Sequence, residues 1–327
     1  MKTAMDSTVS VIIPAYNASR TIGETLRSAS AQTYGNLEII VVDDGSRDET
    51  PEIVRAHAAT DSRIRLVTQA NAGVAAARNA GVAASHGEFI APLDSDDLWH
   101  PAKIERQLQV FRDGGEDVGL VYTWFALIDG QSRVVQLRHD PRYEGDVLAA
   151  LAYRNFIGNG SSALIRRDVF DRTGGYDPSL RGRGGQGCED WKLYFEIAAI
   201  SQFGVVPAPM TGYRDLDDNM SSDVLQMLRS RDLCTADLLP AHPQLAKAFR
   251  SGRNRLSRLL FHRAIRLGRK QDVARLGLSI VRYDPLFFAA MVGSLPISAF
   301  KGVIGRLWRS GGYQGQAAGD FAGLNPL

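Results

Sequence analysis

The chain reads FIAPLDSDD at residues 89–97, an apolar run followed by three carboxylates within four positions. The apolar part is typical of a buried strand. Carboxylates this close raise one another's pKa unless a cation or hydrogen-bond donors lie among them. A divalent ion with oxygen ligands, Mg²⁺ or Mn²⁺, is the usual solution, and it commonly also binds substrate phosphates. The alternative is a solvated turn in which Asp96 or Asp97 caps a helix near Pro101.

Length and composition indicate a globular protein with a substantial core. The 327 residues are 44% apolar and 23% charged, and the formal net charge is +2. No nucleic-acid-binding module accompanies the basic residues, so we expect no nucleic-acid partner. Cys188 and Cys234 form no disulfide framework and have no metal-ligand spacing. Because the start of the chain, residues 1–7, also has no secretory character, we expect a cytoplasmic protein.

Strands and helices alternate through the first hundred residues. Strands are predicted at 9–13, 37–42, 64–67 and 88–93, and helices from about Ser19, near Pro51 and over 73–84. Short units of this kind indicate a parallel, Rossmann-like sheet. Beyond residue 100 the pattern is mixed, with a strand at 118–123 and a hairpin at Asp129-Gly130, and after Ser221 it predicts helices only. The fold class is therefore α/β with a C-terminal helical extension.

A second acidic turn, Asp43-Asp44-Gly45-Ser46, also follows a predicted strand. Ligands of α/β sheets bind at the carboxyl ends of strands. There Tyr16 could stack on a base, and Asp44 could accept a base N–H. Ordinary turn chemistry explains this segment alone, but not two acidic turns at one end of the sheet. Since the glycine fingerprints of dinucleotide and P-loop sites are missing, we expect a nucleotide whose phosphates are neutralised by a metal.

Six motifs follow one another along the chain, and together they identify a family. They are VSVIIPAYN at 9–17, IIVVDDGS at 39–46, NAGVAAARNAG at 71–81, LDSDD at 93–97, GGYD at 174–177 and EDW at 189–191. In this order and spacing they resemble the family 2 glycosyltransferases, which have the GT-A fold. The resemblance implies a mixed Rossmann-like sheet flanked by helices. It implies a catalytic domain at 1–222, with a nucleotide-binding half at about 8–100 and an acceptor half at 101–222, and leaves 223–327 as the helical extension.

The resemblance also implies roles for individual residues. Asp94 and Asp96 would form the metal and ribose pair, with Asp96 as the direct ligand of Mn²⁺ or Mg²⁺. Asp97 would contact the donor sugar, Arg78 the nucleotide, and Asn79 either Asp94 or the sugar. The alternative for Arg78 is an ordinary surface charge on a helix. The full nucleotide-sugar set is Pro14, Tyr16, Asn17, Asp44, Arg78, Asn79, Asp94, Ser95 and Asp97.

The resemblance further implies transfer of a sugar from a nucleoside diphosphate with inversion at the anomeric carbon. Such a reaction needs a general base for the acceptor hydroxyl. The resemblance assigns that role to Asp190, with Glu189 as its rival. Both lie at the start of a predicted helix, where the alternative role is capping, and where the helix dipole is expected to lower the pKa of Asp190. The glycine-rich segment 181–187 just before them predicts a mobile loop whose Arg181 and Arg183 are available to phosphate.

One position departs from the family pattern. Many relatives have a metal-binding histidine where this chain has Leu216. Leucine cannot ligate a metal, so Asp215, Asp217 or Asp218 would substitute, or the donor diphosphate and water would complete the coordination.

The tail, residues 250–309, is rich in arginine, and 256–267 has apolar residues at helical spacing. The apolar run 285–300 is too short to span a bilayer. Two interpretations stay open: a helical cap packed on the catalytic domain, or a basic amphipathic element on the inner face of the plasma membrane.

The sequence thus predicts a metal-dependent, inverting hexosyltransferase that uses a UDP-sugar and a glycan or lipid-linked acceptor in surface polysaccharide assembly. One alternative is a catalytically silent scaffold subunit that binds a sugar nucleotide within a glycan-assembly complex. The other is a sugar nucleotidyltransferase, but the glycine-rich basic loop expected after Ile13 is missing.

Overall fold

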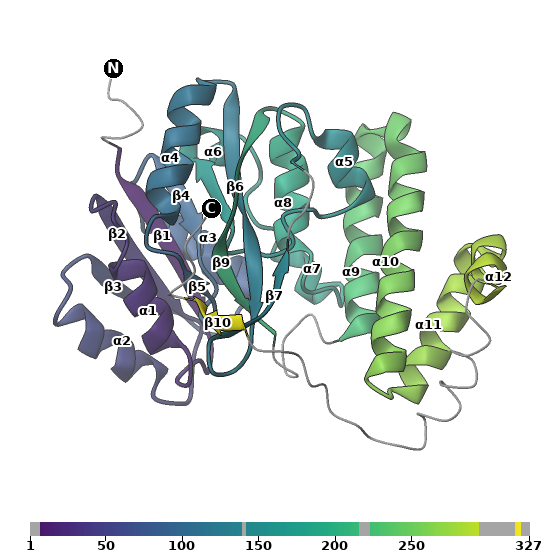
Figure 1. The fold of residues 1–327 in the computed structure, drawn as a ribbon, viewed down its shortest axis with the longest axis horizontal. Helices are drawn as coiled ribbons and strands as arrows, with labels where there is room; N and C mark the ends of the chain where they lie inside the picture. Colours follow the sequence, from purple (N-terminus) through teal and green to yellow (C-terminus); the bar gives the residue numbers. More distant parts are fainter. Residues whose placement is uncertain (1–6, 139–141, 216–222, 294–317, 322–327) are drawn as a thin grey trace.

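The computed structural model describes residues 7–138, 142–215, 223–293 and 318–321, which form a mixed ten-stranded sheet with helices on both faces (Figure 1). The strands are β1 (Val9–Ala15), β2 (Leu37–Asp43), β3 (Ile64–Thr68), β4 (Phe89–Pro92), β5 (Leu98–Trp99), β6 (Val118–Ile128), β7 (Arg133–Arg138), β8 (Ala163–Arg166), β9 (Gln202–Arg214) and β10 (Ala318–Asp320). The four strands predicted in the first hundred residues and the hairpin at Asp129 are therefore confirmed.

Helices connect these strands and then continue alone. They are α1 (Ile22–Ser30), α2 (Thr50–Ala58), α3 (Val74–Ala83), α4 (Lys103–Gly114), α5 (Leu148–Tyr153), α6 (Arg167–Asp171), α7 (Ser179–Gly182), α8 (Glu189–Ala198), α9 (Val224–Leu238), α10 (Ala246–Arg266), α11 (Lys270–Tyr283) and α12 (Pro285–Gly293), with the short 3₁₀ helices Leu239–Ala241 and Pro243–Leu245.

The sheet has a parallel half and a mixed half. The strand order is β10-β7-β6-β8-β4-β1-β2-β3, with β9 paired to both β6 and β5. Strands β4, β1, β2 and β3 are parallel, as expected for strand–helix units, whereas β8 joins β4 and β6 in antiparallel register. The carboxyl ends of β1, β2 and β4 therefore lie together at one edge.

The side-chain alternation of the central strands builds two cores. Val9, Val11 and Ile13 of β1 pack with α1, α2 and α4 on one face. Ile12 faces the other way, into a core shared with α3, α5 and α8. Because successive residues of a strand point to opposite faces, a strand buried on both faces is apolar throughout, as β1 and β2 are.

The C-terminal helices are integrated with the catalytic core. Cys234 and Leu238 of α9 and Phe249 of α10 belong to the same buried cluster as Trp191 of α8. Figure 1 shows α9 and α10 standing beside α5 and α8, with α11 and α12 farther out. The packing of α9 and α10 agrees with the first interpretation, a helical cap, whereas residues 294–309 of the tail lie outside the described residues. Among the described residues, no helix has both the length and the apolar character needed to cross a bilayer.

The expectation of helices only after Ser221 is wrong at one point. The short strand β10 pairs antiparallel with β7 and extends the edge of the sheet. The adjacent Phe321 is 1% exposed and packs against Ala126, Ile128 and Val134. A three-residue strand has no periodicity that a sequence pattern could show, and its pairing depends on an open sheet edge formed almost 200 residues earlier.

Candidate functional site

A cavity of about 930 Å³ lies at the carboxyl ends of β1, β2 and β4 and extends to α9 and α10. Pro14, Tyr16 and Asn17 line it from the end of β1. Tyr16 is 50% exposed, so its ring is available to a ligand. Asn17 has a left-handed backbone (φ 50°). Its N–H donates to Ser46 Oγ (2.9 Å) and its Oδ1 accepts from the Arg47 N–H (2.9 Å), which ties the two strand-end turns together.

Asp44 is buried and organises the loop that leads into α3. Its Oδ1 accepts from Gln69 Nε2 (2.7 Å) and from the N–H of Ala72 (2.8 Å), and its Oδ2 accepts from the N–H of Gly73 (2.8 Å). The carboxylate lines the cavity, as predicted. These three hydrogen bonds hold the loop in its shape. A hydrogen bond from Asp44 to a nucleotide base would be formed in addition to them.

Arg78 connects the turn after β4 to the start of α8. Its guanidinium pairs with Asp94 Oδ1 (2.5 Å) and with Glu189 Oε1 (3.1 Å), and it is 3% exposed. Burial alone would lower the pKa of Arg78, but Asp94 and Glu189 outweigh it and hold the pKa well above its ordinary value. The surface-charge alternative for Arg78 is therefore wrong, because the side chain is a buried, doubly paired cation.

The turn after β4 divides its carboxylates between two environments. Asp94, Ser95 and Asp96 line the cavity, whereas Asp97 is fully buried behind them. Asp97 accepts from Ser161 Oγ (2.5 Å) and from the Arg214 N–H (3.0 Å). Burial, with Asp96 and Asp94 nearby, raises its pKa well above the usual range. The structure places Asp97 beneath the turn that carries the other two carboxylates.

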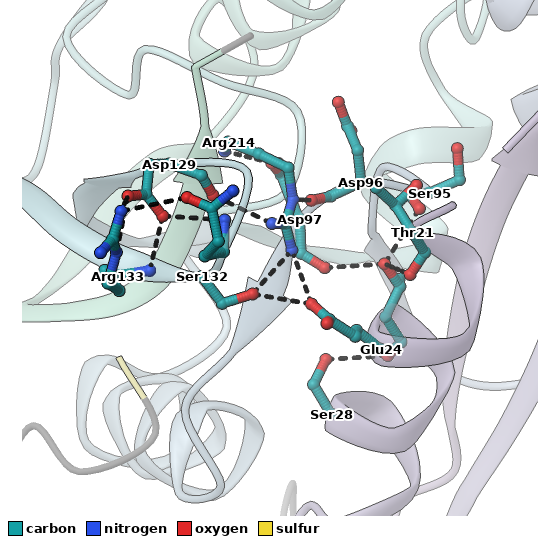
Figure 2. A network of polar contacts seen from close by, with 12 residues as sticks. Thr21, Glu24, Ser28, Ser95, Asp96, Asp97, Asp129, Ser132, Arg133 and Arg214 are labelled. Carbon is teal, nitrogen blue, oxygen red and sulfur yellow. Dashed lines mark hydrogen bonds and ion pairs between the residues drawn. The ribbon is translucent and has the colours of Figure 1, made fainter. Parts of the chain in front are cut away.

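Arg214, at the end of β9, holds this turn in place (Figure 2). Its Nε donates to the Asp96 carbonyl (2.7 Å), its Nη1 to the Asp129 carbonyl (3.0 Å) and its Nη2 to Glu24 (2.9 Å) and Ser132 (3.1 Å). Figure 2 shows the Asp96 side chain directed away from this network. The network thus fixes the backbone of the turn and leaves the Asp96 carboxylate toward the cavity.

Asp190 lies half-buried in the first turn of α8 and lines the cavity. Its Oδ1 accepts from the Trp191 N–H (2.6 Å). Burial and the neighbouring Glu189 raise its pKa to about 7, although Arg78 acts in the opposite direction. The expected lowering by the helix dipole is wrong, because desolvation and the adjacent carboxylate outweigh the dipole here.

Glu189 is engaged elsewhere. Besides pairing with Arg78, it accepts from the Gly187 N–H (2.9 Å) through Oε2 and is 6% exposed. Both of its oxygens therefore have partners within the protein.

Two residues that the sequence places at the site, Asn79 and Arg183, do not line the cavity and instead contact other residues of the protein. Asn79 donates to the Tyr176 carbonyl (2.7 Å) and accepts from the Tyr176 N–H (3.0 Å). Arg183 pairs with Asp237 (2.7 Å) and with Asp177 (3.1 Å), whereas Arg181 lines the cavity. The expectation that both arginines of the glycine-rich segment are available to phosphate is therefore wrong for Arg183.

The glycine-rich segment is also attached to α9. Ser230 Oγ donates to the Gln186 carbonyl (2.7 Å), and Arg229 donates to the Arg183 carbonyl (2.9 Å). These contacts join to α9 a segment for which the sequence predicts a mobile loop, and its mobility stays a prediction. Leu216, Asp217 and Asp218 lie outside the described residues.

The loop between α5 and β8 lines the cavity and was not singled out from the sequence. Asn155 Nδ2 lies 3.5 Å from Asp190 Oδ2. A β-carbon on Gly160 would lie 2.8 Å from Arg78 Nη2, so this glycine leaves room for the Arg78–Asp94 pair. The run NFIGNG at 155–160 has the glycine and asparagine content of a shaped loop, which is the signal that could have indicated it.

The two cavity-lining aspartates of the turn fit a divalent ion. Within the described residues no three His, Cys, Asp or Glu side chains converge as a ready-made metal site. Asp94 and Asp96 supply carboxylate oxygens, the donors that Mg²⁺ and Mn²⁺ prefer, on the wall of an open cavity. Such a pair suits an ion whose remaining ligands come from a phosphate-bearing substrate and water. One oxygen of Asp94 already pairs with Arg78 (2.5 Å).

Residues 10–174 match the family model described as glycosyl transferase family 2. The match covers half of the chain, so this protein belongs to that family of glycosyltransferases. An uncharacterised glycosyltransferase of Rickettsia typhi is 33% identical over 196 residues, which are 59% of each chain. A glucosyltransferase of Escherichia coli, named as UDP-Glc:α-D-GlcNAc-diphosphoundecaprenol β-1,3-glucosyltransferase, is 39% identical over 130 residues, 39% of this chain and 50% of that one. The chain thus aligns with only about half to three-fifths of these relatives' length.

Solved structures with the same architecture confirm the GT-A fold. Staphylococcus aureus TarS 1–349, solved in complex with UDP-GlcNAc, has a TM-score of 0.61 at 16% identity, over 87% of this chain and 83% of that one. The mannosyltransferase PcManGT of Pyrobaculum calidifontis, solved with GDP-Man and Mn²⁺, has a TM-score of 0.57 at 20% identity, over 92% and 83%.

Proposed function

We propose that this glycosyltransferase is inverting and metal-dependent, and that it moves a sugar from a UDP-sugar to a hydroxyl of a glycan or lipid-linked acceptor. The observation that carries the proposal is that Asp94, Asp96 and Asp190 line one cavity. The first two supply oxygen ligands for Mn²⁺ or Mg²⁺. The third has a pKa of about 7, which suits a general base near neutral pH.

On the donor side, Tyr16 stacks on the base and the turns shaped by Asn17 and Asp44 enclose the ribose. Asp96, assisted by Asp94, holds the metal. A divalent ion bound there would neutralise the negative charge that develops on the departing diphosphate. Arg181, which lines the same cavity, adds a positive charge for the phosphates.

At the acceptor, Asp190 removes the proton of the attacking hydroxyl. The acceptor oxygen forms its bond to the anomeric carbon while the bond from that carbon to the diphosphate breaks, so the configuration inverts. Asp190 is preferred to Glu189 because Glu189 is 6% exposed and forms an ion pair with Arg78. Asp190, by contrast, is half-buried, and its Oδ2 lies 3.5 Å from Asn155. Glu189 acts instead as a positioning residue that keeps Arg78 between the two carboxylates.

The relatives support the choice of substrates. One solved neighbour is in complex with UDP-GlcNAc, and one relative is named for a UDP-sugar donor and a diphosphate-linked lipid acceptor. These names support a UDP-sugar donor and a lipid-linked acceptor, and we propose a role in surface polysaccharide assembly.

The test is the configuration of the anomeric carbon in the product. The purified chain is incubated with Mn²⁺ and α-linked UDP-sugars, and ¹H NMR records the configuration of the transferred or hydrolysed sugar. We expect a β product with the native chain, none with Asp190→Asn, and normal yield with Asp168→Asn, an exposed carboxylate of α6. An α product would contradict inversion, and UDP binding without any turnover would favour the silent scaffold.

A further inference from the structure

One wall of the cavity comes from α10, where Arg255, Leu256 and Leu259 line it. Figure 1 shows α9 and α10 on the side of α8 that is away from β1, β2 and β4, whose carboxyl ends form the donor side of the cavity. A volume of about 930 Å³ is at the upper end of the range that one small-molecule ligand occupies. A second ligand bound beside the donor in this cavity would therefore lie against α10.

The charge on this wall is positive. Residues 246–266 include seven Lys and Arg and no Asp or Glu. Arg253 and Arg263 of this helix pair with Asp232 (2.7 Å) and Asp215 (3.3 Å). Among the described residues no carboxylate pairs with Arg255, whose guanidinium lies 6.0 Å from the Tyr153 ring. An arginine on a cavity wall that has no carboxylate partner among the described residues is suited to bind an anionic group of a ligand.

Apolar side chains lie directly beside that charge. Leu259 is 49% exposed and Tyr153 is 40% exposed, and both line the cavity with Leu256 and Met227. The leucine and methionine side chains of this surface gain most from an apolar partner such as a hydrocarbon chain. A guanidinium next to leucine and tyrosine side chains instead matches a phosphate that is attached to a hydrocarbon chain.

The wall is held rigidly against the rest of the site. Gly252, one turn before Leu256, lies against the end of α5, and a β-carbon there would be 2.1 Å from the Tyr153 carbonyl oxygen. Arg231 of α9 donates to the Ala152 carbonyl (2.8 Å) at the same junction. Because α5, α9 and α10 pack closely together, the part of α10 that carries Arg255 is held at the wall of the cavity that Asp190 also lines.

We propose that Arg255, Leu256 and Leu259 form an acceptor subsite that binds the phosphate and the adjoining hydrocarbon chain of a lipid-linked saccharide. The inference rests on the proposed function and adds to it the class of acceptor and the residues that select it. The saccharide end of such an acceptor lies toward Asp190, while its hydrocarbon chain leaves the cavity along Leu259.

The probe is farnesyl diphosphate, titrated calorimetrically into the full chain that is already saturated with UDP and Mn²⁺. Saturation blocks the donor side, so the measured binding reports the second subsite. Inorganic diphosphate and farnesol serve as the phosphate-only and chain-only probes. We expect farnesyl diphosphate to bind more tightly than either. Arg255→Gln and Leu259→Gln should each weaken it about tenfold, as expected for the loss of one charge-assisted contact or one buried apolar side chain.

Two matched variants control for folding and for general charge. Arg258→Gln removes an exposed arginine of the same helix, and Leu278→Gln changes a leucine of α11 that is 58% exposed. Both should bind farnesyl diphosphate as the native chain does. The subsite would be overturned if farnesyl diphosphate and inorganic diphosphate bound equally well, or if the Arg258 and Arg255 variants lost equal affinity for farnesyl diphosphate. In either case the proposed function would stand as long as UDP binds. If UDP itself does not bind, the proposed function fails, and the same comparison with farnesyl diphosphate alone decides the subsite.

Discussion

Asp190 shows how one carboxylate obtains a pKa that its local sequence does not indicate. The first turn of a helix stabilises negative charge, which by itself would lower the pKa. Burial and the adjacent Glu189 act in the opposite direction, and the pKa of Asp190 rises to about 7. Position in a helix can be predicted from sequence. Desolvation depends on distant segments that pack around the carboxylate, such as the loop that carries Asn155, and this packing has no local signal in the sequence.

The raised pKa of Asp190 should set how the rate of sugar transfer depends on pH. Asp190 acts as a base only when it is deprotonated, so kcat/KM for transfer should rise with pH, by about tenfold per unit below pH 7, and level off above it. The measurement is a pH–rate profile from pH 5 to 9 with saturating Mn²⁺. A profile that is flat through pH 7, or that falls as pH rises, would show that Asp190 is not the base.

The same shift has an effect on stability. The folded pKa is above the ordinary value of 3.8, so the native chain should lose stability as pH rises from about 4 to 7. Asp190→Asn removes this penalty. Its melting temperature should exceed that of the native chain at pH 8, with a gap that narrows as pH falls below 7. A gap of constant size from pH 5 to 8 would contradict the shift.

Arg214 supports the acidic turn from behind. Its side chain donates to the carbonyls of Asp96 and Asp129 and to Glu24, and it is 1% exposed. Arg214→Met should cost about 3 kcal/mol of unfolding free energy, since buried acceptors lose a charged donor. Arg133→Met, which removes an exposed ion pair with Asp129, should cost less than about 1 kcal/mol. Urea unfolding measures both, and equal losses would contradict the role of Arg214.

Among the helices and strands, the sequence predicts best those features whose signal lies within a short segment of the chain. Strands β1, β2 and β4 were predictable because a strand buried on both faces is an apolar run. The acidic turns after β2 and β4 were predictable because sheet edges bring strand ends together. The Arg78–Glu189 pair joins residues 111 positions apart and has no local signal. The contribution of α9 and α10 to the cavity was equally hidden, because helical periodicity indicates a buried face but not its partner.

The junction of α10 with α5 gives a prediction for an element. A β-carbon on Gly252 would lie 2.1 Å from the Tyr153 carbonyl oxygen and 2.3 Å from Arg231 Nη2. Gly252→Ala must therefore displace α10, and we expect a loss of about 3 kcal/mol or more, despite the better helix propensity of alanine. Gly277→Ala in α11 meets only contacts of 3.7 Å and should be neutral or stabilising. Thermal unfolding of both variants decides this, and a stable Gly252→Ala chain would contradict the packing.

For the molecule as a whole, the boundary predicted at residue 222 separates catalytic motifs from helices, but it does not separate two cores. Cys234, Leu238 and Phe249 share a cluster with Trp191, Phe195 and β-strand residues such as Ile12. We expect the full chain to unfold in one urea transition, with coincident far-UV circular dichroism and tryptophan fluorescence. A chain ended at residue 222 should lack a cooperative transition. Two separate transitions in the full chain would show that the helical extension folds independently.

The central claim is a nucleotide site completed by a metal at Asp96. The most direct test is thermal unfolding of the native chain and of Asp96→Ala with UDP, GDP, dTDP and CDP, each with and without Mn²⁺. A ligand at one hundred times its Kd stabilises the folded state by about 2.7 kcal/mol. We predict that UDP with Mn²⁺ raises the melting temperature of the native chain, that UDP without Mn²⁺ raises it less, and that Asp96→Ala loses the metal-dependent part. An equal shift with and without Mn²⁺, or an unchanged shift in Asp96→Ala, would contradict the metal site, and no shift with any nucleotide would contradict the nucleotide site itself.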